Sequence, residues 1–452
     1  MRRLARSEAG VEGVGAGRLG VFVEALAASG QELQTLMLLR HGKVVLEQEW
    51  APYRITDRHA LYSISKSFTS MGVGLAIEDG LLGLDDQVVS FFGPADLPAE
   101  ISDNLAAMRV RDLLTMTTGH TEDVVVAGSD TPRRQFLATE VAEKPGTLFV
   151  YNTGATFMLS AILQRVTGQK LLDYLKPRLF EPIGATEARW QETPDGINTG
   201  GWGLELNTES VAVFGQLLLD RGGDVIPAHW VEAATSKQVP NDNQDNPDWR
   251  KGYGFQFWRS RHNSYRADGA FGQFLVVLPE QDAVLVITSA APNMQAVLEV
   301  IWEHLLPALE GPDDGVYAPT VDFDLKPPSL GKAAPGDGTT YVFEANQFGL
   351  LTARLDRDGS GTFSFDLGAT GTVQDVVCRE GDWAETRWRL GWLGDRLLTS
   401  ATGDPFTASM RFAETPQLYT LTCRPDGDTI TVDIHVNVGF GPADTTLIGR
   451  AG

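Results

Sequence analysis

The sequence predicts an α/β domain followed by a separate all-β domain. The chain has 452 residues, more than one ordinary compact domain contains. Residues 20–310 alternate between helical and extended hydrophobic patterns, as expected where helices pack on a sheet. Beyond about residue 340 only short strand patterns recur, separated by turns rich in Gly and Asp.

Local patterns place the elements of the first domain. Residues 36–47 are expected to form two strands around a turn at His41-Gly42-Lys43. An apolar helix follows close to Ser63. The other elements have apolar side chains on one helical face, or apolar runs bounded by turns. They are helices over 155–166, 208–220 and 294–309, and strands over 274–278 and 283–288.

Composition gives the domain boundaries. We expect a first domain over 1–310, a linker over 311–339 and a second domain over 340–452. The linker contains five prolines together with several Gly and Asp, which favours an extended chain. In the second domain, residues 429–436 alternate cleanly between apolar and polar side chains. Short strands at this spacing predict a small barrel or sandwich.

Charge and terminal sequence limit the possible partners. The chain has 37 Lys and Arg against 59 Asp and Glu, a net charge of −22. This field opposes binding to nucleic acid and to anionic membrane surfaces. The first residues lack the apolar core of a signal peptide, and no apolar run is long enough to span a membrane. We therefore expect a cytoplasmic protein, with Cys378 and Cys423 as buried thiols and not a disulfide.

The most informative motif is Ser63-x-x-Lys66 at the start of the apolar helix. Positions three apart share a helix face, so both side chains are expected to enter one site. A serine hydroxyl becomes a nucleophile when a neighbouring base removes its proton. A lysine can do this only if burial or nearby charge leaves its amine neutral. A Ser-x-x-Lys pair alone is weak evidence, because a capping serine and a solvated lysine give the same pattern.

Two later segments strengthen this interpretation. Tyr151 lies just before a predicted helix and could pass a proton between Ser63, Lys66 and a leaving group. Gly269 and Ala270 lie at the end of a predicted strand that leads into the hairpin over 274–288. A glycine there allows the backbone and a substrate to approach closely.

In this order the motifs resemble those of the serine β-lactamase and penicillin-binding superfamily, in particular its class C-like hydrolases. That group includes class C β-lactamases, D-aminopeptidases, carboxylesterases and nylon-oligomer hydrolases. The resemblance extends over about residues 20–310. Besides Ser-x-x-Lys, it rests on segments similar to the family's LLTHTSG, PGxxFxYSNTG, GG and FGxLLL motifs, which lie here at 113–120, 145–154, 195–201 and 214–217.

The resemblance implies a fold and a site. The fold is an antiparallel sheet flanked by helices, with an added helical lobe, and the second domain resembles a lipocalin. Ser63 would be the nucleophile, with Lys66 and Tyr151 sharing its proton and either of them acting as the base. The backbone N–H groups of Ser63 and Ala270 would form the oxyanion hole. The residues expected to bind substrate are Asn152, Trp202, Asp268 and Gly269.

Two departures from the family pattern matter. The family's Tyr-x-Asn is Tyr151-Asn152-Thr153 here, and the alternative alignment on Asn152 puts Val150 at the tyrosine position. We keep Tyr151. The family's Lys-Thr-Gly or His-x-Gly element is Ala267-Asp268-Gly269, which lacks the cation that helps to hold a substrate carboxylate. Its absence argues against β-lactam turnover and favours neutral esters or amides.

Other motifs carry little weight. A G-x-G-x-x-G match at 15–20 follows no strand, and the loop from Asp356 has Leu367 where a calcium loop has Glu. No metal or cofactor is indicated. The expected function is hydrolysis of small esters or amides, with D-amino-acid peptidase, peptide cyclase or β-lactamase as alternative activities. A silent penicillin-binding-type receptor is the non-enzymatic alternative, and a homo-oligomer is possible.

Overall fold

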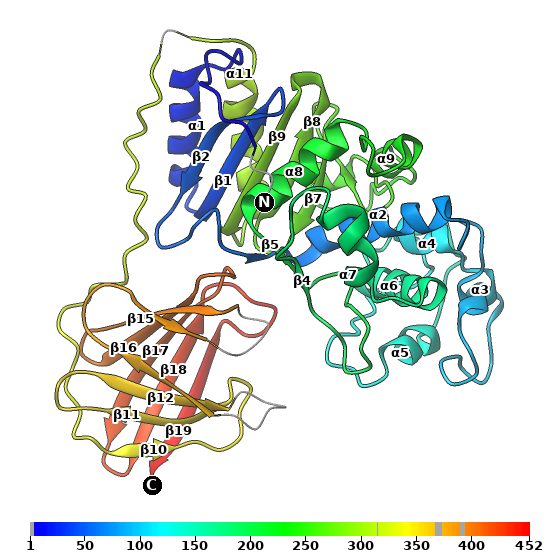
Figure 1. The fold of residues 1–452 in the computed structure, drawn as a ribbon. Helices are drawn as coiled ribbons and strands as arrows, with labels where there is room; N and C mark the ends of the chain where they lie inside the picture. Colours follow the sequence, from blue (N-terminus) through cyan, green and yellow to red (C-terminus); the bar gives the residue numbers. More distant parts are fainter. Residues whose placement is uncertain (1–3, 314, 367–372, 389–393) are drawn as a thin grey trace. The chain divides into compact units, whose positions relative to one another are not determined.

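The computed structural model describes residues 4–313, 315–366, 373–388 and 394–452. The chain divides into two compact units, which are treated separately below (Figure 1). The first unit comprises Met1–Gln48, Ile55–Thr288 and Asn293–Val321. The second comprises Glu49–Arg54, Ser289–Pro292 and Asp322–Gly452, so it includes a short segment from early in the chain.

A six-stranded sheet forms the centre of the first unit. Its order is β2-β1-β9-β8-β7-β6, and the neighbouring strands from β6 to β9 pair antiparallel. The strands are β1 Glu32–Arg40, β2 Lys43–Glu49, β6 Trp258–Arg259, β7 Tyr265–Gly269, β8 Gln273–Leu278 and β9 Ala283–Ala290. Both predicted hairpins are present, at the expected turns. In β8 and β9 every residue is buried, because helices cover both faces of the sheet.

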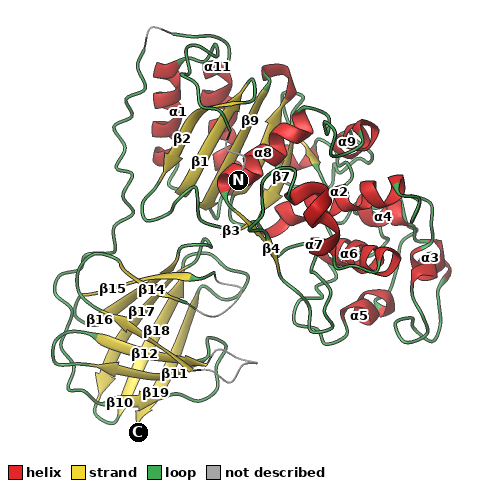
Figure 2. Ribbon diagram, viewed as in Figure 1, coloured by secondary structure: helices red, strands yellow, loops and turns green. Residues whose placement is uncertain are grey.

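Helices pack on the two faces of this sheet. On one face lies α8 (Thr208–Leu219); α1 (Ala16–Ala28), α10 (Met294–Val300) and α11 (Leu306–Ala308) pack together on the other (Figure 2). The helix expected over 294–309 is therefore present, although a π-helical turn at Ile301–Leu305 interrupts its α-helical geometry. Pro307 contributes to this break because it has no N–H to donate to the preceding turn.

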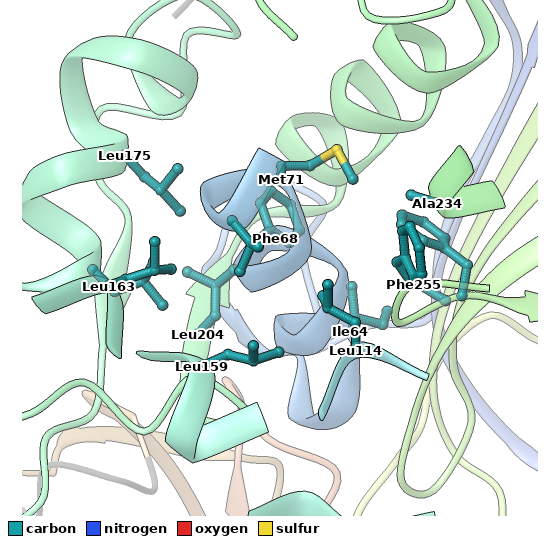
Figure 3. Close-up of a cluster of buried hydrophobic side chains, with 14 of the residues drawn as sticks. Ile64, Phe68, Met71, Leu114, Leu159, Leu163, Leu175, Leu204, Ala234 and Phe255 are labelled. Carbon is teal, nitrogen blue, oxygen red and sulfur yellow. The ribbon is translucent and has the colours of Figure 1, made fainter. Parts of the chain in front are cut away.

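The remaining helices form the predicted lobe around α2 (Ser65–Glu78). They are α3 Asp103–Ala107, α4 Val110–Leu114, α5 Pro132–Ala138, α6 Thr153–Thr167, α7 Leu171–Leu175 and α9 Ala228–Thr235. Figure 3 shows Phe68 and Met71 of α2 among apolar side chains of neighbouring helices, such as Leu163 of α6 and Leu175 of α7. Gly74 lets α9 approach, since a Cβ there would lie 2.3 Å from the Trp230 ring. Packing on nearly every side holds α2 in a fixed position.

A small sheet orders the chain that leads into α2. It pairs β3 (His59–Ala60) with β5 (Leu204–Leu206), and β5 with β4 (Arg189–Trp190). The backbone N–H of Leu61 also donates to Leu204 O at 2.9 Å. The residues just before Ser63 are therefore tied to a segment about 140 positions later in the chain, immediately after the Gly200-Gly201 pair.

The second unit is a ten-stranded antiparallel sheet that nearly closes into a barrel. Its order is β13-β12-β11-β10-β19-β18-β17-β16-β15-β14. Near the open ends, Ala401 N donates to Arg379 O at 2.8 Å. The strands are β10 Thr340–Val342, β11 Leu350–Leu355, β12 Gly361–Asp366, β13 Val373–Cys378, β14 Ala384–Arg387, β15 Arg396–Thr402, β16 Phe406–Phe412, β17 Leu418–Asp426, β18 Thr429–Val436 and β19 Asp444–Ala451. Cys378 and Cys423 are free and buried within its apolar core, as predicted.

Candidate active site

Ser63 and Lys66 meet at the start of α2. Ser63 lies in a 3₁₀ turn, Tyr62–Ile64, that leads directly into the helix, and its side chain is half-buried. Lys66 is one turn further on and is 1% exposed. Its Nζ donates to Ser63 Oγ at 2.9 Å. The i, i+3 spacing therefore brings the expected nucleophile and base into direct contact.

The amine of Lys66 is surrounded by neutral acceptors. Besides Ser63, it donates to Gly201 O at 2.8 Å and approaches Thr153 Oγ1 at 3.4 Å. Across the described ranges no carboxylate forms a salt bridge with it. Burial lowers the pKa of Lys66 to about 7, and the more distant charge of Asp123 opposes that shift only partly. Near neutral pH a substantial fraction of this lysine is a neutral amine.

Tyr151 lies on the other side of the same two residues. Its ring centroid is 5.0 Å from Lys66 Nζ, and its side chain interacts with that of Ser63. Trp258 stacks on the ring with a centroid separation of 5.1 Å. Burial raises the pKa of Tyr151 above its ordinary value, so the phenol keeps its proton at neutral pH. Val150, the alternative candidate, instead donates its backbone N–H to Met116 O at 2.9 Å.

Asn152 and Thr153, which follow Tyr151, make contacts that the sequence did not predict. Asn152, predicted to bind substrate, is fully buried and caps α6, with its Oδ1 accepting from Ala155 N at 3.2 Å. The same oxygen accepts from Val124 N at 3.3 Å. Thr153 is the residue that contacts Lys66, from the third position of the tyrosine motif. The departure from Tyr-x-Asn therefore leaves a hydroxyl group beside the lysine.

The expected oxyanion hole lies where two backbone segments run side by side. Ala270 follows β7, and a Cβ at Gly269 would lie 2.2 Å from Leu61 O. Glycine is therefore required at 269, because the backbone there passes close to Leu61, two residues before Ser63. The turn Tyr62–Ile64 is thus in contact with β7, and an oxyanion hole formed by the N–H groups of Ser63 and Ala270 stays a prediction.

Asp268, expected to bind substrate, is paired with a buried arginine. The side chain is 6% exposed, and both carboxylate oxygens accept from Arg266 Nε, at 2.9 and 3.0 Å. Burial raises the pKa of Asp268 to about 6, although Arg266 opposes the shift. Ala267, between them, is 2% exposed and belongs to the apolar core. Alternation along β7 puts Arg266 and Asp268 on one face and Ala267 on the other.

Arg266 was not recognised from the sequence. It is completely buried and donates from Nη1 to Ser260 Oγ at 2.6 Å and to Asp248 O at 3.0 Å. Its guanidinium lies 4.5 Å from the Trp249 ring centroid and 5.9 Å from that of Trp258, the residue that stacks on Tyr151. A charged residue three positions before the motif glycine, within an otherwise apolar strand pattern, was the available signal.

The Gly200-Gly201 segment acts through its backbone. The carbonyl of Gly201 accepts from Lys66, and that of Gly200 accepts from Thr69 Oγ1 at 2.8 Å. A Cβ at Gly201 would lie 2.9 Å from Thr153 O, so the segment fits closely against α6. Trp202, expected to line the substrate pocket, is half-buried and packs against the core, and its carbonyl accepts from Trp190 Nε1 at 2.8 Å.

The motifs given little weight have structural explanations. The glycines at 15–20 begin α1, where the Asp313 carboxylate accepts from Gly17 N and Arg18 N, each at 3.0 Å. The loop after Asp356 is the β11–β12 hairpin turn. Within the described residues, no group of three or more His, Cys, Asp or Glu side chains is arranged to hold a metal ion. None of the described helices is both long and apolar enough to cross a membrane.

Comparison with known proteins agrees with this geometry. The Beta-lactamase family model matches residues 19–308, and the chain belongs to this family. The 6-aminohexanoate-dimer hydrolase of Paenarthrobacter ureafaciens is 26% identical over 286 residues, which are 57% of this chain and 72% of that protein. Lovastatin esterase of Penicillium rubens is 24% identical over 209 residues, 40% of this chain and 52% of the esterase.

One solved structure is similar to both units. The octameric penicillin-binding protein homologue from Pyrococcus abyssi aligns with 95% of this chain and 99% of its own, with a TM-score of 0.53 and 15% identity. At this identity the similarity concerns the fold alone.

Proposed function

We propose that this protein is a serine hydrolase that cleaves small esters or amides through an acyl-enzyme on Ser63. One observation carries the proposal: Lys66 Nζ is 2.9 Å from Ser63 Oγ, in a buried position without a carboxylate partner among the described residues. A lysine in such surroundings can be neutral and accept the proton of the serine. The presence of Ser63, Lys66 and Tyr151 together argues against a catalytically silent receptor.

In the proposed mechanism Lys66 is the base. Ser63 Oγ attacks the carbonyl carbon while its proton passes to the Lys66 amine, giving a tetrahedral oxyanion. The N–H groups of Ser63 and Ala270 stabilise that oxyanion. The proton then passes through the Tyr151 hydroxyl to the leaving alcohol or amine, and water later releases the acid from Ser63. The pKa of Lys66, about 7, suits a base at neutral pH, whereas the raised pKa of Tyr151 suits a relay that remains protonated.

The substrates proposed are neutral esters or amides. Ala267 offers no cation to a substrate carboxylate, and the charge of Arg266 is already directed at Asp268. Two family members named as hydrolases of a 6-aminohexanoate dimer and of lovastatin agree with amide or ester chemistry outside the β-lactams. D-amino-acid peptidase and peptide cyclase activities remain the alternative within the same mechanism.

A single set of assays tests the proposal. We expect a fluorophosphonate probe to label Ser63, as located by mass spectrometry, and kcat/KM for a neutral p-nitrophenyl ester to exceed that for nitrocefin. Absence of labelling and of turnover for esters, D-peptides and lactams would favour a receptor. A parent enzyme that prefers nitrocefin would instead make this chain a β-lactamase. Ala267→Lys should shift preference towards anionic substrates, with some loss of stability because Ala267 is packed in the core.

A further inference from the structure

Two aromatic residues with unusual backbone conformations flank the proposed oxyanion hole. Tyr62 has φ 48° and Phe271 has φ 65°, and both angles belong to the left-handed region that favours glycine. Tyr62 immediately precedes Ser63, and Phe271 immediately follows Ala270. Each N–H donor of the hole therefore has a strained neighbour. Bulky residues are held in this region only where the surrounding structure enforces it, and such residues gather at functional sites.

The residue type at position 271 is also unusual for a hairpin turn. Phe271 and Gly272, with φ 65° and 86°, are the second and third of the three residues, 270–272, that connect β7 to β8. Turns with two positive φ angles ordinarily use Asn, Asp or Gly at the first position. The same fold contains a comparable turn far along the sheet, His41-Gly42, with φ 49° and 73°, between β1 and β2. Phenylalanine at 271 is therefore an unfavourable choice for forming the turn itself.

The two strained residues contact each other. Their rings meet edge to face, with centroids 5.4 Å apart and planes at 88°. Both side chains are half-buried, at the surface of the site and not in its core. The same two backbone segments are also in direct contact where Gly269 lies against Leu61 O. The segment carrying one donor is thus joined to the segment carrying the other at two places.

We propose that the Tyr62–Phe271 contact is a positioning device that fixes the separation and direction of the Ser63 and Ala270 N–H groups. The proposal rests on the acyl-enzyme function proposed above. Because donors must point at the oxyanion of the transition state, a small loss of alignment lowers kcat more than it raises KM. Tyr62 and Phe271 are positioning residues in this scheme and need not touch the reacting atoms.

The decisive variant is Phe271→Asn, because it removes the ring while relieving the backbone strain. We expect kcat for a neutral ester to fall by about tenfold or more, since complete loss of one donor costs about 10²–10³. KM should change less than threefold, and the melting temperature should stay the same or rise. Phe271→Tyr, which keeps an aromatic ring, should retain most of the activity, whereas Phe271→Leu should not.

A matched control exists in the same sheet. His41→Asn makes the equivalent change in the β1–β2 turn, away from the site, and should leave kcat and KM unchanged. Combining Tyr62→Leu with Phe271→Leu should cost little more than either change alone, because both remove the same contact.

The outcomes separate this proposal from the function on which it rests. If the parent labels at Ser63 and turns over ester but Phe271→Asn keeps kcat within twofold, the positioning role is overturned and the hydrolase function stands. A raised KM with unchanged kcat would also overturn it, and would make Phe271 a substrate contact. A parent that neither labels nor turns over any substrate overturns both.

Discussion

The two units bury reactive groups by the same physical means and obtain opposite results. In the first, burial lowers the pKa of Lys66 to about 7 and leaves a neutral amine beside Ser63. In the second, burial raises the pKa of Cys423 to about 12 and also raises that of Cys378. Desolvation favours the neutral form of each group. A neutral amine is a base, whereas a neutral thiol is a poor nucleophile, so only the first unit gains chemistry.

Buried arginines give a second comparison. Arg266 in the first unit is paired with Asp268 beside the aromatic group that supports Tyr151. Arg411 in the second unit is 3% exposed and lies 5.5 Å from the ring centroids of Tyr53 and Trp383, with Nη1 donating to Tyr53 Oη at 3.1 Å. There it holds the early segment Glu49–Arg54 within the second unit, which is a structural task.

If chemistry is confined to the first unit, Ser63→Ala should have the largest effect on activity. It should abolish acyl-enzyme formation and lower ester hydrolysis by at least about 10³, because it removes the hydroxyl group that lies 2.9 Å from Lys66 Nζ. The fold should persist, since the change leaves almost no cavity. Fluorophosphonate labelling, turnover and a thermal melt measure these expectations. Hydrolysis within tenfold of the parent would remove Ser63 from the mechanism.

Lys66→Met and Tyr151→Phe should each lower kcat by at least about 10², and their effects should be strongly non-additive because both serve one proton path. Near-parental activity in Tyr151→Phe would point to another proton carrier. In the parent, kcat should rise with pH through about 7 as the Lys66 amine loses its proton. A pH–rate profile without that limb would argue against Lys66 as the base.

Lys66→Met should also change stability, in the opposite direction to activity. Between about pH 7 and the ordinary lysine value of 10.5 the unfolded chain binds more protons than the folded chain, so the parent gains stability as pH rises. The variant lacks this dependence. It should be more stable than the parent below about pH 7, by on the order of 1–4 kcal/mol, and the difference should shrink towards pH 10.5. Chemical denaturation at pH 6.5 and pH 10 tests the sign.

Removing the second unit tests whether chemistry is confined to the first. A chain ending at Val321 should still label at Ser63, because none of the proposed catalytic residues lies beyond that point. It should be less stable, since Trp50 packs on Phe323 within the second unit, with ring centroids 5.4 Å apart. A soluble, folded truncation that no longer labels would show that the second unit completes the site.

The smallest effects are expected at the thiols. Cys378→Ser and Cys423→Ser should leave kcat and KM unchanged. Without denaturant, a thiol reagent such as Ellman's reagent should react with the parent only at the rate of local opening, because both thiols are buried and protonated. Fast modification under native conditions would mean that the second unit exposes a reactive group after all.

The sequence was sufficient where local spacing determines geometry. Ser63 and Lys66 share a helix face, so their contact follows from an i, i+3 relation once α2 forms. The two hairpins, the all-β second domain and the buried cysteines also follow from patterns within short windows. The family resemblance rested on the same ordered motifs, and the family match over residues 19–308 agrees with it.

Only the tertiary structure decided contacts between distant segments. In the structure Asn152 caps α6, whereas Thr153, the next residue in the chain, contacts Lys66. The structure pairs Arg266 with Asp268, so the charge of Asp268 is compensated within its own strand. The rings of Tyr62 and Phe271 meet across 209 positions. The types and spacing of the residues indicate what chemistry they can perform. Which side chains come into contact depends on how α2, α6 and β7 pack, and no local sequence pattern encodes that packing.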